Sequence, residues 1–247
     1  MDSQKLLSLT RKCIDLYQLI DDGDHIAVGV SAGKDSLSLL ITLDRLRKFY
    51  PRKFDFSAIT VDLGLGNFNL EPVCELCKKL DIPYYIVKTD IADVLYNVRK
   101  ESNPCALCAK LRKGALNDKA KEIGANKIAY AHHKDDLIET SLMALIFEGR
   151  YYTFSPKTYL DRTGLTVIRP FILVDEADIV SFAKREELPI CKNPCPMDGV
   201  TKREYVKNLL KKIYEENPGA DKRLFRAIVD GDLPGWPPRK EDERHKL

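Results

Sequence analysis

A short loop of small and polar residues, Ser31-Ala32-Gly33-Lys34-Asp35-Ser36, separates the apolar run 25–30 from a stretch in which leucines recur at helical spacing. Small residues let backbone N–H groups approach an anion closely, and a helix N-terminus favours negative charge. Lys34 adds a mobile cation. The loop therefore predicts a phosphate site, and the alternative is an ordinary turn with Asp35 and Ser36 as polar first-turn residues. The methyl group of Ala32 fits at little cost if its φ is negative.

Two Cys-x-x-Cys pairs differ in their surroundings. Cys105 and Cys108 stand where a helix is expected to begin, and the free N–H groups of its first turn, with Lys110, Arg112 and Lys113, favour thiolates. This pair is the candidate for metal or persulfide chemistry. Cys74 and Cys77 instead share an apolar helical stripe, which favours a structural role over a zinc or redox role.

A third cysteine site is expected in the proline-held segment 191–197. The tripeptide Asn-Pro-Cys occurs twice, ending at Cys105 and at Cys195, and proline fixes the chain where a ligand must point in one direction. Both Cys191 and Cys195 are candidates on these grounds.

Two further strand ends carry polar residues. Val61 and Asp62 close the run 54–61 before a glycine-rich loop, where an open parallel sheet binds ligands, so we expect the adenine or ribose of a nucleotide there. The run 127–131 is followed by His132-His133-Lys134-Asp135-Asp136. Carboxylates at such an edge suit Mg²⁺ beside nucleotide phosphates, and His132 is expected in the polar wall of the pocket. Zinc binding by the adjacent histidines is the alternative, although successive strand side chains point apart.

Basic and aromatic residues interleave over 149–164, and basic residues recur from Arg203 to Lys212. The first segment suits phosphates and unstacked bases as well as it suits a surface hairpin. The second is either a solvated helix face or a patch facing a nucleic acid.

Strands and helices alternate along most of the chain, which predicts an α/β fold with a parallel sheet and helices on both faces. We expect an amphipathic helix within residues 1–22, the main domain over 23–190 and a C-terminal helical segment over 191–247.

The 247 residues carry 40 basic and 37 acidic side chains, and a net charge of +3 is too small to indicate a polyanion partner by itself. Since the sequence shows neither a membrane-spanning apolar run nor a signal peptide, we expect the seven cysteines to meet a reducing cytoplasm.

The loop 31–36 resembles that of the PP-loop ATP pyrophosphatases, which release pyrophosphate by adenylating a substrate. Together with Cys105-x-x-Cys108 and Leu111-Arg112, the run 132–136, Ile168-Arg169-Pro170 and a later Cys-Pro, it resembles the tRNA 2-thiolation enzymes of the TtcA/TtuA group over about residues 24–230. The double histidine and the Leu-Arg-Lys after Cys108 are closer to the branch that thiolates a cytidine of the anticodon loop.

This resemblance implies ATP, Mg²⁺ and a [4Fe–4S] cluster as cofactors, with tRNA and a sulfur donor, either a cysteine desulfurase or sulfide, as partners. Mg-ATP adenylates the C2 oxygen of the base, sulfide attacks C2, and AMP departs. The implied roles are phosphate binding by Ser31, Gly33, Lys34, Asp35 and Ser36, metal binding by Asp135 or Asp136, charge neutralisation by Arg112, and cluster binding by Cys105, Cys108 and Cys195, the last preferred because Pro196 follows it.

Several alternatives stay open. A uridine thiolase and a lysidine synthetase share the loop, and a zinc-bound nucleotide-binding module without thiolase activity is a candidate of another class. The sequence leaves both a monomer and a homodimer open.

Overall fold

The computed structural model describes residues 3–66, 68–99, 104–192, 194–195, 201–231, 233 and 236. Its centre is a six-stranded sheet with the order β3-β2-β1-β4-β6-β5. Five strands are parallel, and β5 pairs antiparallel with β6 at one edge. Their bounds are β1 Asp24–Gly29, β2 Phe54–Asp62, β3 Tyr84–Lys88, β4 Lys127–Ala129, β5 Lys157–Leu160 and β6 Leu165–Ile168. The predicted fold class is confirmed.

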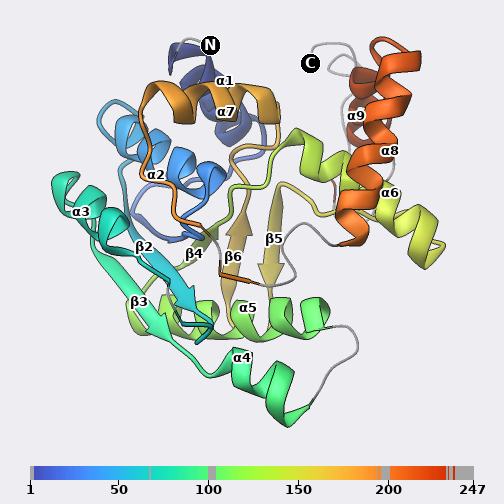
Figure 1. Ribbon diagram of the computed structural model, residues 1–247. Helices are drawn as coiled ribbons and strands as arrows, with labels where there is room; N and C mark the ends of the chain where they lie inside the picture. The colour runs from blue at the N-terminus through green and yellow to red at the C-terminus, as the bar shows by residue number, and fades with distance from the viewer. Residues whose placement is uncertain are drawn as a thin grey trace.

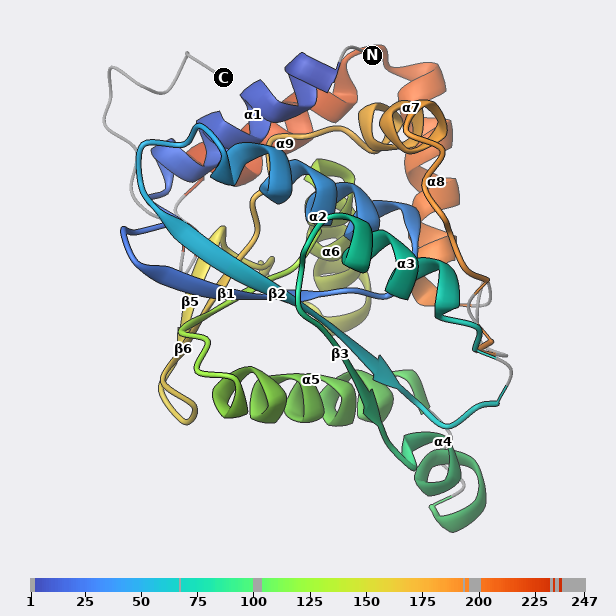
Figure 2. The same ribbon diagram turned by 90° about the vertical axis from the view of Figure 1, so that its left-hand side faces the viewer.

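Helices cover both faces of the sheet (Figure 2). One face carries α1 Ser3–Leu16, α2 Lys34–Arg47, α3 Glu71–Lys79 and α7 Glu176–Arg185. The other carries α4 Ile91–Asp93, a π-helical turn at Val94–Val98 and α5 Pro104–Glu122. At one end of the molecule, α8 Lys202–Glu216 and α9 Ala220–Asp230 pack on α6 Lys134–Glu148 (Figure 1).

The core lies on both sides of the sheet because parallel strands are apolar on both faces. Ile26 and Val28 of β1 point into a large cluster shared with α1, α2 and α7, and Ala27 between them points into a smaller cluster that includes Leu116 of α5. Burying one such leucine contributes about 1.5–3 kcal/mol. Residues of α1, α8 and α9 also belong to the large cluster, and the segment boundaries expected from the sequence stay a prediction.

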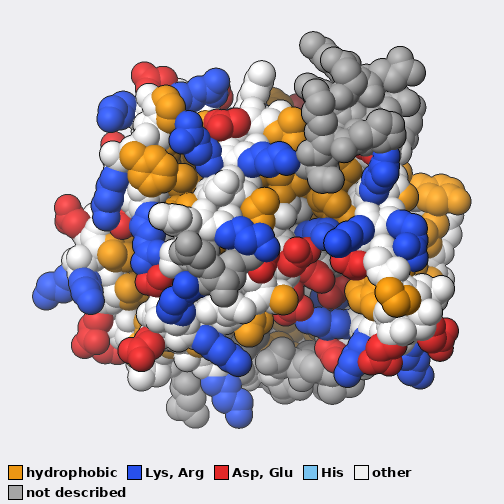
Figure 3. Space-filling view, turned by 90° about the horizontal axis from the view of Figure 1, so that it is seen from above, with side chains coloured by type: hydrophobic (Ala, Val, Ile, Leu, Met, Phe, Trp, Pro, Cys, Tyr) orange, Lys and Arg blue, Asp and Glu red, His pale blue; other side chains and the backbone are white. Residues whose placement is uncertain are grey.

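The surface above α1, α2 and α7 mixes both signs of charge. Figure 3 shows Lys and Arg side chains scattered among Asp and Glu side chains over this face, with apolar side chains between them. This face therefore offers no single large basic field for a polyanion. Within the described ranges, no helix has both the length and the apolar character needed to cross a membrane.

Candidate functional site

A pocket of about 560 Å³ lies at the carboxyl ends of β1, β2 and β4. The chain runs from β1 outward to β2 and β3, then returns to place β4 on the other side of β1. This is the switch point at which open parallel sheets bind ligands. The pocket joins the loop after β1, Val61 and Asp62 at the end of β2, and His132 and Asp136 after β4.

The loop after β1 is a tight turn held by its own side chains. The Ser36 hydroxyl accepts a hydrogen bond from the Ser31 backbone N–H at 3.1 Å and donates to the Gly33 carbonyl at 3.1 Å. Ala32 is buried and has φ +59°, in the left-handed region. Its φ is therefore not the negative value at which an alanine methyl group costs little, and the methyl group strains the backbone here. The Ala32 carbonyl accepts the Cys191 N–H at 3.0 Å, which ties the loop to segment 191–195.

The six loop residues do not all face this pocket. Ser31, Asp35 and Ser36 line it, whereas Lys34 Nζ lies 3.1 Å from Asp35 Oδ2 and 2.9 Å from Glu176 Oε1 at the start of α7. Burial works to lower the pKa of Lys34, but its bond to Glu176 and the nearby Asp35 charge raise that pKa above its ordinary value. The ammonium group is therefore charged and held by two carboxylates.

His133 holds two carboxylates at the pocket wall. It forms a capping box with Asp136 at the start of α6, and its Nε2 lies 3.3 Å from Asp136 Oδ2 and 3.9 Å from Asp35 Oδ1. Asp35 Oδ1 is buried and accepts no hydrogen bond from the part of the chain that the structure describes. Two carboxylates, one with a vacant acceptor oxygen, fit the oxygen ligands that Mg²⁺ prefers.

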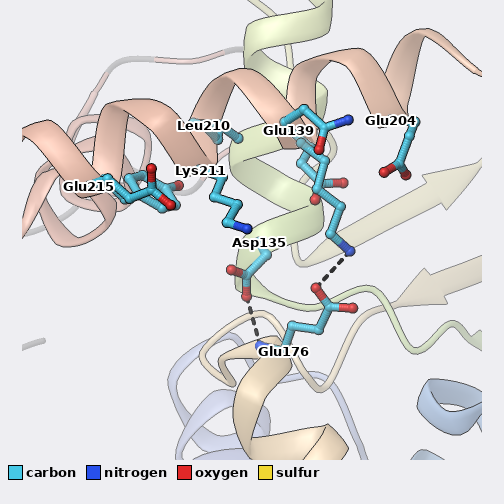
Figure 4. Close-up of a pocket in the computed structure, with 10 residues that line it drawn as sticks. Asp135, Glu139, Glu176, Glu204, Leu210, Lys211 and Glu215 are labelled. Carbon is cyan, nitrogen blue, oxygen red and sulfur yellow. Dashed lines mark hydrogen bonds and ion pairs between the residues drawn. The ribbon is translucent and has the colours of Figure 1, made fainter.

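Asp135 faces a second pocket, of about 530 Å³, between α6, α7 and α8. Figure 4 shows its carboxylate directed toward the N-terminus of α7, where Asp135 Oδ2 accepts the Glu176 N–H at 2.7 Å. Asp135 therefore caps α7, and of the two candidates for the metal, Asp136 is the one that lines the pocket at the switch point.

Two basic residues of α8 are paired within the protein. Arg203 Nη1 lies 3.1 Å from Asp136 Oδ1 and 2.9 Å from Glu139 Oε2, and Lys207 Nζ lies 2.8 Å from Glu176 Oε2. The sequence left this helix open as a solvated face or a patch facing tRNA; Arg203 and Lys207 are partly exposed and also form ion pairs within the protein, so both interpretations stay predictions. Their charges neutralise carboxylates of α6 and α7.

The three cysteines expected to act together line one pocket of about 180 Å³. Cys105 and Cys108 come from the first turn of α5, Cys195 from segment 191–195, and Tyr96 from the π-helical turn completes the wall. Cys191 does not line this pocket. No three His, Cys, Asp or Glu side chains of the described ranges already stand as ligands of a single metal ion. Three thiols spread around a cavity suit a larger group such as an iron–sulfur cluster.

Burial changes the expected chemistry of these thiols. The sequence favours thiolates at a basic helix start, but burial raises the pKa of Cys108 above its ordinary value, against the lowering effect of the Arg112 charge. For Cys108 without a bound metal the expectation is wrong. Of the other pair, Cys77 is buried and its pKa rises to about 12, which favours the structural interpretation.

Arg112 of α5 joins the two sites. It lines both the switch-point pocket and the cysteine pocket, together with Leu63, Leu65 and Ala109. A charged group on this shared wall can act on both cavities at once.

On the β4 side, the pocket wall includes residues that the sequence did not assign to the nucleotide pocket. Tyr152, Phe154 and Arg169 line the pocket beside His132, whose ring centroid lies 4.8 Å from that of Phe154. Burial lowers the pKa of His132 to about 4, so its ring is neutral near pH 7. Of the segment 149–164, for which the sequence left a surface hairpin and a base-binding loop as alternatives, only the part from residue 157 onward belongs to a hairpin, which spans 157–168. The aromatic residues before it, Tyr152 and Phe154, line the pocket. The interleaving of Arg150, Tyr152 and Phe154 was the signal for this wall.

Comparison with known proteins identifies the family to which this chain belongs. A family model described as a PP-loop domain matches residues 4–213. A relative from Geobacter sulfurreducens is 34% identical over 228 residues, covering 91% of this chain and 89% of its own, and one from Geotalea daltonii is 38% identical over 222 residues, covering 89% and 88%. Both are named tRNA-cytidine(32) 2-sulfurtransferase.

Two solved structures share the fold. The U34-tRNA thiolase NcsA from Methanococcus maripaludis, solved with its [4Fe-4S] cluster, superposes with a TM-score of 0.74 at 23% identity, covering 90% of this chain and 76% of its own. The NH3-dependent NAD synthetase from Campylobacter jejuni gives 0.54 at 19% identity, covering 97% and 99%. The match to the PP-loop model and the extent of identity with the named relatives show that the chain belongs to the PP-loop family, in the branch of the tRNA-cytidine(32) 2-sulfurtransferases.

Proposed function

We propose that this protein is an ATP-dependent tRNA sulfurtransferase that replaces the C2 oxygen of a cytidine in the anticodon loop with sulfur. The observation that carries the proposal is the shared wall between the pocket at the phosphate loop and the pocket of Cys105, Cys108 and Cys195, with Arg112 lining both. An activated oxygen and an incoming sulfur must meet at one carbon, and two adjoining pockets allow this.

The chain's own residues divide the work between the pockets. Ser31, Asp35 and Ser36 bind the phosphates of ATP, and Val61 and Asp62 border its adenosine. Asp35 and Asp136 would hold Mg²⁺, which would shield the phosphate charge. The C2 oxygen attacks the α-phosphorus and pyrophosphate leaves; sulfur then attacks C2 and AMP leaves. Arg112 neutralises the charge that develops between the pockets.

Cys105, Cys108 and Cys195 would hold a [4Fe–4S] cluster as thiolates. Since such clusters usually have four thiolate ligands, holding one with three would leave it able to bind the incoming sulfur. A cysteine desulfurase or sulfide is the sulfur donor, the site of action is the cytoplasm, and a homodimer is compatible with this scheme.

The test is an assay of protein purified without oxygen, with tRNA, Mg-ATP, sulfide and lysine, followed by mass spectrometry of the tRNA nucleosides. We expect 2-thiocytidine, together with iron in the protein and pyrophosphate in solution. Zinc without iron and no pyrophosphate release would instead indicate a nucleotide-binding module. Thiolated uridine would indicate the uridine branch, and a lysine-modified cytidine without a cysteine requirement would indicate a lysidine synthetase.

Paired variants separate the two pockets. Cys105→Ala should abolish iron retention and leave ATP binding nearly intact, and Asp35→Ala should do the reverse. Cys74→Ala is the matched control, since Cys74 lines neither pocket. Unchanged iron content in Cys105→Ala would remove the proposed cluster site.

A further inference from the structure

The β4 side of the switch-point pocket contains a largely buried cation, Arg169, to which the described residues supply no anionic partner. Arg169 Nη1 donates to the Ser155 carbonyl at 2.6 Å and to Thr158 Oγ1 at 3.3 Å, and the guanidinium lies 5.0 Å from the centroid of the Phe154 ring. Its Nε is buried without an acceptor, and no ion pair with Arg169 forms within the described residues. A buried donor left unpaired is costly, and an acceptor on a ligand that reaches Nε from this pocket would offset that cost.

A second unpaired nitrogen lies on the same wall. His132 Nδ1 is buried and has no hydrogen-bond partner in the described ranges, and its ring is fixed between Tyr130 and Phe154 at centroid distances of 5.6 and 4.8 Å. Most buried polar side-chain atoms in folded proteins have a partner. Two exceptions lining one pocket indicate a ligand with polar atoms along one edge.

An exposed aromatic ring, that of Tyr152, lies on the β4 side of the pocket. Tyr152 lines the pocket, is 41% exposed, and lies under the Arg150 guanidinium with 4.4 Å between that group and the ring centroid. An exposed ring backed by a cation, with donors and acceptors further in, matches how proteins bind an unstacked base: one surface stacks on the base and others read its edge.

We propose that this half of the pocket receives the target pyrimidine, stacked on Tyr152 and read along its edge by Arg169 Nε and His132 Nδ1. The inference rests on the proposed function. The nucleotide occupies the β2 half and the loop after β1, so the base that attacks its α-phosphorus must come from the β4 side of β1. His132 is thereby reassigned from the nucleotide to the base.

A double-mutant cycle between protein and RNA tests this contact. Binding of an anticodon stem–loop is measured with a non-hydrolysable ATP analogue, once with cytidine at position 32 and once with an abasic residue there. For the wild-type protein we expect cytidine to bind about 5- to 100-fold more tightly than the abasic loop. In Tyr152→Ala this ratio should fall about 5-fold or more, because stacking is lost while the contacts of Arg169 and His132 remain, and Tyr152→Phe should restore it because the ring is kept.

The control is Tyr159→Ala, since Tyr159 is 61% exposed on the hairpin that follows Tyr152 but does not line the pocket. Its ratio should equal that of the wild type. An unchanged ratio in Tyr152→Ala overturns the inference, and so does an Arg169→Gln variant that loses affinity for the ATP analogue while keeping the ratio. Failure of the proposed function is a separate result: wild-type protein would then form no 2-thiocytidine.

Discussion

Ala32 is the residue at which the phosphate loop departs most from relaxed backbone geometry, with φ +59° and a buried methyl group. This conformation costs an alanine about 1–2 kcal/mol. Glycine would relieve that strain. Against this gain, the substitution removes a buried methyl group, which costs about 0.8 kcal/mol, and it increases the conformational entropy of the unfolded chain, which costs about 0.4–1 kcal/mol. We therefore expect Ala32→Gly to change the free energy of unfolding, measured in urea, by less than about 1 kcal/mol.

A β-branched side chain cannot adopt the same angle without strain. Ala32→Val should lower the free energy of unfolding by at least about 2 kcal/mol, since overpacking adds to the backbone cost. The matched control is Ala177→Val on the exposed face of α7, where only helix propensity changes, by less than about 0.7 kcal/mol. Equal losses in the two variants would contradict the left-handed conformation of Ala32.

Single residues also show what local pattern can and cannot predict in the site. The family and the grouping of the candidate residues at strand ends followed from the sequence, because carboxyl ends of parallel strands meet at one edge. The partners of Lys34 and Asp135 did not follow. Lys34 forms an ion pair with the Glu176 carboxylate and Asp135 accepts the Glu176 N–H, yet Glu176 lies 41 positions after Asp135 and more than a hundred after Lys34, so no spacing within either motif encodes these contacts.

At the scale of elements, apolar runs predicted β1, β2 and β4 to within two residues, because strands buried on both faces leave a continuous apolar signal in the sequence. The start of α5 was harder to interpret. Its charges and helix dipole favour thiolates, yet the π-helical turn and the loop after β2 wall in Cys108, and the desolvation they impose has no sequence signature.

Helices α2 and α7 are joined by an ion pair whose effect depends on pH. Arg45 bonds both carboxylate oxygens of Glu186, and this bond, more than any other cause, holds the pKa of Glu186 below its ordinary 4.5. Stability from a lowered carboxyl pKa is complete above the unfolded pKa and is lost as pH falls through the folded one. Glu186→Gln should therefore cost about 1 kcal/mol at pH 7 and almost nothing once the pH is well below 4.5.

Urea unfolding of both proteins at several pH values measures this difference. Glu187→Gln serves as the control, since the neighbouring side chain is exposed. A penalty for Glu186→Gln that stays constant down to the acid limit would argue against the ion pair.

For the whole molecule, Arg203 connects the C-terminal helices to the site. It compensates Glu139, whose carboxylate is buried and whose pKa is raised by that burial despite the Arg203 charge. Arg203→Ala leaves this charge uncompensated and should lower the free energy of unfolding by about 2 kcal/mol at pH 7. Because Glu139 can then bind a proton in the folded state, the loss should shrink as pH falls toward 5. Lys212→Ala, on the exposed face of α8, should show neither effect.

One side chain, that of Arg112, connects the two pockets. Arg112 lines both cavities, whereas its neighbour Lys113 lines only the switch-point pocket. Arg112→Gln should keep its iron and its affinity for ATP, because neither the thiols nor the phosphate loop is altered, yet lose at least about 100-fold in 2-thiocytidine formation, since charge developing between the pockets is no longer neutralised. Lys113→Gln should retain most of that activity. If Arg112→Gln loses ATP binding in proportion to thiolation, the arginine serves the nucleotide alone and the pockets are coupled by other means.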